Sequence, residues 1–189
     1  MGDIIVLSVL ALVVTLVIVF QVRKKKKGGA YALNSTAQKR PGIMGKEASF
    51  AASEAYKLLR TKIQYSFAGD KNCRVIGISS ALTGEGKSLT AVNLAYTLSQ
   101  LDKKVLLVDC DMRRPTLAEK MGLLKTPGLS NYLTRQCHLN ELVQDCGLEG
   151  NETAFQVTTA GQNPPNPVEL LSSERMKKAL GVLREVYDY

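Results

Sequence analysis

The stretch Ala81-Leu82-Thr83-Gly84-Glu85-Gly86-Lys87-Ser88 is a glycine-rich loop that ends in a lysine and a serine. It matches the pattern Gly-x-x-x-x-Gly-Lys-Ser/Thr at Gly86, Lys87 and Ser88, and Ala81 stands at the first position, where Gly is usual. Gly84 and Gly86 permit backbone conformations in which successive N–H groups point inward and bind an anion. The stretch is therefore predicted to be a P-loop that binds the phosphates of a nucleotide.

The segments on either side of this loop have the patterns of a strand and a helix. Residues 74–79 form a short apolar run, and residues 87–101 place apolar side chains on one helical face. A helix that starts at the loop adds its positive N-terminal dipole to the phosphate site. A glycine-rich turn without a ligand is the alternative, but a loop between a strand and a helix is the context that favours phosphate binding.

The lysine and the serine of the loop have separate expected roles. Lys87 can reach the β- and γ-phosphates, and the hydroxyl of Ser88 can ligate Mg²⁺. The residues predicted to bind the nucleotide are Thr83, Gly84, Glu85, Gly86, Lys87, Ser88 and Leu89.

A second loop with two carboxylates follows another predicted strand. Residues 105–108 are apolar at every position, as in a strand that is buried on both faces, and Asp109 and Asp111 come directly after them. The carboxyl ends of parallel strands are where α/β sheets bind ligands. The two aspartates could coordinate Mg²⁺ or accept a proton from an attacking hydroxyl, and Arg113 and Arg114 could neutralise phosphate. A solvated acidic turn with local ion pairs is the alternative.

The remaining segments alternate between helical and strand patterns. We expect a helix over about 49–67, a looser helical stretch over 116–146, a strand at 155–159 and a last helix that starts at Pro167. This alternation predicts an α/β fold, a parallel sheet flanked by helices as in P-loop NTPases.

An apolar segment near the start of the chain has the length of a transmembrane helix. As a helix, residues 4–22 would measure about 28 Å, close to the roughly 30 Å of a bilayer's hydrocarbon core. Asp3 precedes this segment and five basic residues follow it at 23–27, the reverse of the order in a signal peptide. Because positive charge remains in the cytoplasm, we expect a single-pass anchor in the cell membrane, with the N-terminus outside. The expected organisation is an anchor at 1–22, a basic juxtamembrane linker at 23–48 and a cytoplasmic P-loop domain at 49–189.

The charge distribution argues against a nucleic-acid-binding protein. The net charge is +8, but residues 1–46 alone carry eight Lys or Arg side chains against one acid, Asp3. The rest of the chain is close to neutral, whereas a nucleic-acid binder has its basic patch on the folded domain. The four cysteines lack the spacing of a zinc site and indicate reduced thiols of a cytosolic domain.

From about Glu47 onward the chain resembles the bacterial tyrosine kinases (BY-kinases) of capsule and exopolysaccharide export systems. Residues 83–88 look like the Walker A motif of that family, and residues 105–113 look like its Walker A′ motif, an apolar strand followed by Asp-x-Asp-x-Arg. Residues 161–171 resemble the segment that leads into the family's next long helix. Related ATPases that partition plasmids or select the division site usually have an extra lysine early in the P-loop, which is absent between Ala81 and Gly86.

The resemblance implies ATP as the nucleotide, Mg²⁺ as the metal and a protein tyrosine as the phosphate acceptor. By resemblance, Lys87 would bind the transferring phosphate, Ser88 and Asp111 would hold Mg²⁺, and Asp109 would be the base toward the tyrosine hydroxyl. The residues themselves support the pair of aspartates and leave open which one is the base. The tyrosines would belong to the same chain or to neighbouring subunits, and the implied partners are polysaccharide export and chain-length proteins.

A third motif of the family concerns ring-like assembly. Residues 54–60 resemble its Glu-x-x-Arg-x-x-Arg motif, with Glu54, Lys57 and Arg60 at the three charged positions. Lys57 departs from the motif and removes a bidentate fork, which would weaken an interface salt bridge there. An ordinary solvated helix face explains these charges equally well.

One expected motif is missing from the sequence. The family's Walker B motif is an apolar strand followed by Asp, and the chain stops at 185–189, where that strand should begin. We therefore expect a truncated kinase with an incomplete sheet and weak activity alone. The alternatives are a membrane-tethered P-loop ATPase of the partitioning or division-site type and a non-catalytic nucleotide-binding fragment.

Overall fold

The structure is a computed structural model that describes residues 49–67, 73–147 and 155–189. All of them belong to one compact unit, Lys39–Tyr189. The expected anchor at 1–22 and linker at 23–48 lie outside the described residues. Within the described ranges, no helix has the length and apolarity needed to cross a membrane.

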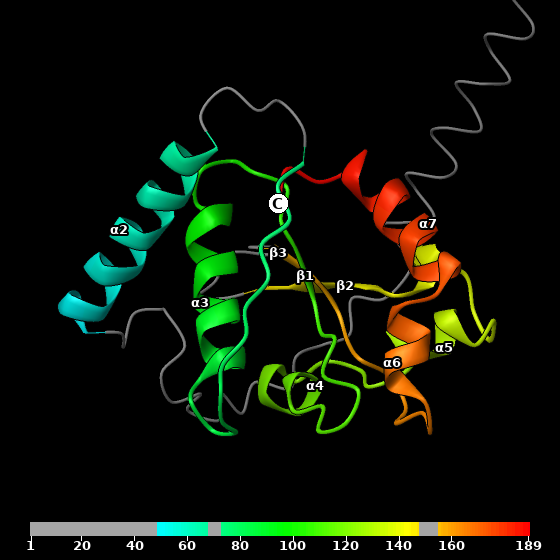
Figure 1. The fold of residues 1–189 in the computed structure, drawn as a ribbon. Helices are drawn as coiled ribbons and strands as arrows, with labels where there is room; N and C mark the ends of the chain where they lie inside the picture. Colours follow the sequence, from blue (N-terminus) through cyan, green and yellow to red (C-terminus); the bar gives the residue numbers. More distant parts are fainter. Residues whose placement is uncertain (1–48, 68–72, 148–154) are drawn as a thin grey trace, which may run out of the picture. The chain divides into compact units, whose positions relative to one another are not determined.

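The centre of this unit is a mixed sheet with helices on both sides. The strands β1 (Leu106–Val108), β2 (Val143–Cys146) and β3 (Phe155–Thr158) lie in the order β1-β3-β2. In Figure 1, α2 and α3 lie on one side of the sheet, and α5, α6 and α7 lie on the other. This arrangement confirms the α/β prediction.

The prediction of a wholly parallel sheet is wrong. β1 pairs with β3 in parallel, with Leu107 opposite Val157, but β2 pairs with β3 antiparallel, with Gln144 opposite Val157. The reason is the short separation of the two strands in the sequence, because only residues 147–154 lie between the end of β2 and the start of β3. Parallel neighbours require a longer crossover connection, whereas antiparallel neighbours do not.

Residues 74–79 are not assigned as a strand, contrary to expectation. At the start of this segment, the Arg74 N–H donates to the Asp188 carbonyl at 2.9 Å. The Arg74 side chain also donates to the Phe67 carbonyl at 3.1 Å. On the other side, the Asp188 N–H donates to the Lys104 carbonyl, and the Leu106 N–H donates to Tyr189. The last residues therefore lie between the segment at 74 and the start of β1.

The two long helices predicted around the phosphate loop are confirmed. α2 (Phe50–Ser66) begins where the Ser49 hydroxyl accepts a hydrogen bond from the Ala52 N–H, and α3 (Lys87–Ser99) begins at the loop itself. Residues 92–98 of α3 are all buried, and the helix packs against α2, β1 and β3. This burial fixes the helix N-terminus, and with it the loop that precedes it.

The region at 116–146 is more broken than a helical stretch. It contains α4 (Leu117–Met121), α5 (Leu129–Leu133), the 3₁₀ turn η1 (Leu139–Glu141) and β2. Gly122 ends α4 with a left-handed φ of 65°. Gly128 precedes α5 and approaches Gly161 so closely that an added Cβ would lie 2.3 Å from the Gly161 nitrogen.

The last predicted helix is in fact two helices. α6 (Pro167–Leu171) starts at the expected proline, and α7 (Glu174–Arg184) follows after a break at Ser172 and Ser173. The Ser173 hydroxyl accepts a hydrogen bond from the Met176 N–H and so caps a new helix start. α7 ends at Arg184, so Tyr187 lies beyond it.

Candidate nucleotide site

The phosphate loop has the backbone geometry that anion binding requires. Gly84 and Gly86 have φ values of 85° and 91°, in the region that L-residues rarely adopt. A Cβ at either glycine would meet no atom within 4 Å, so the backbone conformation rather than lack of space requires glycine. Gly86 is also the N-cap of α3, which brings the helix N-terminus to the loop. We infer that the N–H groups of this turn are available for phosphate oxygens.

The side chain of Lys87 lies against the beginning of the loop. Its Nζ donates to the Ser80 hydroxyl at 2.9 Å and to the Leu82 carbonyl at 3.2 Å. These bonds hold the ammonium group beside the loop that is predicted to bind the phosphates. Ser80 had not been predicted as a site residue because it precedes the motif, and the sequence contains no signal for this contact.

The Glu85 side chain bonds to the backbone of the phosphate loop. Its Oε2 accepts a hydrogen bond from the Leu82 N–H at 3.1 Å. This bond, with a smaller contribution from Ser80, lowers the pKa of the Glu85 carboxyl below its ordinary value. Among the other predicted nucleotide-binding residues, Thr83 and Leu89 are exposed, and Ser88 lies half-buried in the first turn of α3. Glu85 thus holds the loop conformation through the backbone.

The second loop presents one carboxylate oxygen without a partner. The Asp109 backbone is held at the end of β1 by a bond from its N–H to the Thr158 carbonyl, 2.9 Å long. Its Oδ1 accepts from the Asp111 N–H at 3.0 Å, while its Oδ2 is buried and has no hydrogen-bond partner in the described part of the chain. Burial raises the pKa of the Asp109 carboxyl. Such an oxygen is expected to bind a cation or accept a proton.

Asp111 and the two arginines that follow it are exposed. The Asp111 Oδ1 accepts a hydrogen bond from the Arg114 N–H at 3.0 Å. Neither arginine forms an ion pair with an aspartate in the ranges that the structure describes, where the ion pairs are Lys57–Glu54, Lys103–Asp188 and Lys177–Glu174. The described residues therefore lack the ion pairs of the alternative, a solvated acidic turn, but share its exposure.

The two loops lie at the same end of the folded unit. Figure 1 shows the loop that precedes α3 and the segment between β1 and α4 along the lower edge of the molecule. The described residues contain no hydrogen bond or ion pair between Lys87 and either aspartate. The segments that carry the lysine and the two aspartates thus lie at one end of the unit, and none of the printed bonds of Lys87 goes to an aspartate.

The donor set at this edge fits Mg²⁺ bound together with phosphates. In the described ranges, no group of three or more His, Cys, Asp or Glu side chains could hold a metal alone. Mg²⁺ does not need such a group, because it binds through one or two protein oxygens, substrate phosphates and water. The unpartnered Oδ2 of Asp109, the Asp111 carboxylate and the Ser88 hydroxyl are oxygen donors of the required kind.

The residues of the predicted assembly motif do not act as one group. Glu54 and Lys57 form an exposed ion pair of 2.9 Å within α2. Arg60 turns to its own subunit, and its Nη1 donates to the Thr97 carbonyl of α3 at 2.8 Å. Arg60 therefore joins α2 to α3.

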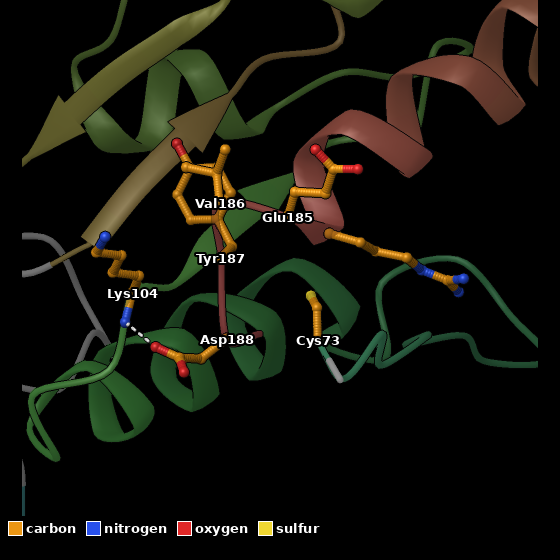
Figure 2. Close-up of a pocket in the computed structure, with 7 residues that line it drawn as sticks. Cys73, Lys104, Glu185, Val186, Tyr187 and Asp188 are labelled. Atoms are coloured by element: carbon orange, nitrogen blue, oxygen red, sulfur yellow. Dashed lines mark hydrogen bonds between the residues drawn. The ribbon is translucent and has the colours of Figure 1, made fainter. Parts of the chain in front are cut away.

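A cavity of about 650 Å³ lies away from these loops. Its lining includes Cys73, Lys104 and Asp188, which Figure 2 shows together with residues 184–187. A 2.8 Å hydrogen bond from the Lys104 N–H to the Asp188 carboxylate closes one side of it. Burial raises the pKa of the Cys73 thiol, so this cysteine is not an activated nucleophile.

Comparison with known proteins places this geometry in a family. Residues 76–189 match the model of the CobQ/CobB/MinD/ParA nucleotide binding domain. The chain belongs to this family. Within it, the chain is 37% identical over 165 residues to the tyrosine-protein kinase YwqD of Bacillus subtilis, and covers 65% of that protein with 87% of its own length.

The similarity extends to a second kinase and to a solved structure. The chain is 36% identical over 138 residues to the tyrosine-protein kinase Etk of Escherichia coli K12, covering 73% of this chain and 18% of that protein. The kinase domain of E. coli ETK superposes with a TM-score of 0.67 at 35% identity, over 72% of this chain and 52% of that one. The chain thus spans less than two thirds of these relatives, and the resemblance to bacterial tyrosine kinases is confirmed.

Proposed function

We propose that this chain binds ATP with Mg²⁺ at its phosphate loop and transfers the γ-phosphoryl group to a tyrosine hydroxyl. The observation that carries the proposal is the buried Oδ2 of Asp109, which has no hydrogen-bond partner among the described residues. Asp109 belongs to the segment between β1 and α4, which lies at the same end of the unit as the phosphate loop (Figure 1). A nucleotide site alone would need the loop and its lysine. An additional carboxylate without a partner provides a group for the metal or for the acceptor's proton.

The chemistry follows from what each side chain presents. The N–H groups of residues 83–88 hold the phosphates at the start of α3, and the Lys87 ammonium offsets the charge of the transferring group. Mg²⁺, when bound by Ser88 and Asp111, supplies further charge neutralisation. As the tyrosine oxygen bonds to the γ-phosphorus, the bond from that phosphorus to ADP breaks, and Asp109 accepts the hydroxyl proton. The two aspartates could exchange these roles.

The test is phosphotyrosine formation by the purified chain with radiolabelled ATP and Mg²⁺. We expect label on tyrosine, resistant to alkali, and expect Lys87→Met or Asp109→Asn to reduce its rate of formation at least about 100-fold. Glu174→Gln is the control, because within the described residues the ion pair of Glu174 is with the exposed Lys177 of α7. Equal labelling by Lys87→Met and the unmodified chain would contradict the proposal.

The second candidate is an ATPase that changes conformation without phosphorylating protein. The matching family model favours it, since its description includes MinD and ParA. Release of inorganic phosphate without any phosphotyrosine, lost in Lys87→Met, would support this candidate. Nucleotide binding without either product would indicate a non-catalytic nucleotide-binding fragment.

We also propose a membrane location, supported by the apolar segment at 4–22 and the basic residues at 23–27. The chain should then remain in the membrane fraction after a carbonate wash, and a tag before residue 4 should be digested by protease added from outside the cell. Deletion of residues 4–22 should release it. Recovery of the intact chain in the soluble fraction would contradict this location.

The proposed biological role is control of capsule or exopolysaccharide synthesis and export. Its expected substrates are tyrosines of the same chain or of neighbouring copies in a ring, and its partners are export and chain-length proteins. This role depends on the proposed kinase activity. The names of the relatives state only a tyrosine-protein kinase activity. Replacement of the chromosomal copy by Lys87→Met should alter the amount or length of the polysaccharide.

A further inference from the structure

Ser80 lies just before the phosphate-loop motif and contacts its lysine directly. The Ser80 hydroxyl accepts a hydrogen bond from Lys87 Nζ at 2.9 Å and donates one to the Leu82 carbonyl at 2.9 Å. Lys87 Nζ also donates to that carbonyl, at 3.2 Å. Three groups that are two to seven residues apart in the chain therefore meet at one point.

These contacts use the hydrogen-bonding capacity of both backbone groups of Leu82, its carbonyl and its N–H. Its carbonyl accepts from Ser80 and from Lys87, and its N–H donates to Glu85 at 3.1 Å. A carbonyl oxygen has two lone pairs and an ammonium group has three protons, so Lys87 keeps one N–H that points at none of these partners. The geometry thus fixes the position of the ammonium group and leaves it a donor for a ligand.

From these contacts we infer that Ser80 is a positioning residue for nucleotide binding, which holds the Lys87 ammonium beside the phosphate loop. The inference rests on the proposed function of the same site. A lysine side chain has four flexible bonds, and restricting it before the ligand arrives reduces the entropy that binding must otherwise remove. Without the Ser80 hydroxyl, Lys87 would keep only its bond to the Leu82 carbonyl.

The inference concerns the part of the effect that passes through Lys87, because the Ser80 hydroxyl also bonds to the Leu82 carbonyl and contributes to the lowered pKa of the Glu85 carboxyl. Ser80→Ala should weaken the binding of a nucleoside triphosphate about three- to tenfold, the range for one partly exposed hydrogen bond to a charged group. Ser80→Thr should restore most of the affinity because it keeps the hydroxyl. In a Lys87→Met background, Ser80→Ala should have little further effect, since the group that it positions is gone.

A matched control is available at the neighbouring position. Ser79 is exposed, and its hydroxyl makes no hydrogen bond in the described part of the chain. Ser79→Ala removes the same atom from the adjacent residue and should leave the affinity unchanged within about twofold. Urea unfolding of each variant measures whether the fold itself has been altered.

The experiment is a titration of the full 189-residue chain with a fluorescent ATP analogue and Mg²⁺, arranged as a double-mutant cycle of Ser80→Ala and Lys87→Met. Loss of affinity in Ser80→Ala, rescue by Ser80→Thr and little further loss in the double variant would support the inference. Equal losses with and without Lys87, or a parallel fall in the urea midpoint, would overturn it as a merely structural role. Failure of the unmodified chain to bind the analogue would instead overturn the proposed function.

Discussion

Replacement of Gly86 by alanine is the sharpest perturbation of the phosphate loop. Gly86 has a φ of 91° and lies at the N-cap of α3, without a side-chain cap of its own. An added Cβ would meet no atom within 4 Å. Alanine therefore introduces no clash and removes no contact, so its only effect is the cost of a backbone conformation that L-residues avoid.

That cost sets the size of the expected effect. Holding an L-residue in the left-handed region costs about 1–2 kcal/mol. The loop at residues 81–85 is exposed, so we expect it to relax before nucleotide binds and to return to the present geometry on binding. The strain then makes the free energy of nucleotide binding less favourable. A change of about 1–2 kcal/mol corresponds to a loss of affinity of about 5- to 25-fold. Contact of the new methyl group with a phosphate would increase this loss.

The assay combines nucleotide titration with urea unfolding of the same variants. We expect Gly86→Ala to bind ATP and Mg²⁺ more weakly by this factor, with little change in the free energy of unfolding. Gly77→Ala is the control, since its Cβ also meets nothing within 4 Å and its φ lies outside the left-handed region. If the loop does not relax in the free protein, the free energy of unfolding should instead fall by the same amount, about 1–2 kcal/mol. A variant with neither effect would refute the claim that this glycine conformation forms the site.

Three further substitutions test the packing that holds the site in place. Gly128→Ala should destabilise the unit by about 2–4 kcal/mol in urea unfolding, because its Cβ would overlap backbone atoms of Gly161 that no rotamer can move. Arg60→Met should cost about 1–2 kcal/mol in the same assay, since it removes the bond to the Thr97 carbonyl. Glu54→Gln, which breaks only an exposed ion pair, should cost less than about 0.5 kcal/mol, and a larger loss would show that this helix face has another contact.

The parts of the fold that follow from local sequence were predicted well. The loop at 81–88 combines glycine conformations, a lysine and a helix start within a few residues, and the structure gives it positive φ values at Gly84 and Gly86. α2 has a long amphipathic pattern, which local sequence specifies strongly, and α3 follows the loop directly, although residues 92–98 are buried on all faces of this helix. The apolar run that precedes Asp109 likewise led to β1, although the residues of this strand are half-buried rather than buried on both faces.

The parts that depend on distant partners were missed. Val143–Cys146 has one β-branched residue in four, and it is a strand because β3 offers it an edge to pair with. Residues 74–79 have a stronger strand pattern, yet they form no ladder in the described part of the chain. In both cases the neighbour, rather than the propensity, decides the outcome. Only the break before α7 had a readable signal, Ser173 at an N-cap ahead of Glu174.

The same distinction applies to the candidate site. The residue types that bind phosphate and metal could be named from their spacing, because the motif is local. Two contacts could not be predicted in this way: that of Ser80 with Lys87 and that of Arg60 with α3. Each depends on where the end of a long side chain lies in the folded protein. A sequence pattern therefore predicts which groups are present, and the structure is needed to find what holds them.

The central claim is that the loop before α3 holds the phosphates of a nucleotide through Lys87. Its most direct measurement is the affinity of the intact chain for ATP and Mg²⁺, compared with that of Lys87→Met, by calorimetric titration. We predict saturable binding at one site and a loss of at least about 30-fold in the variant, with both proteins equally stable in urea. Equal affinity of the two proteins for ATP would contradict the account.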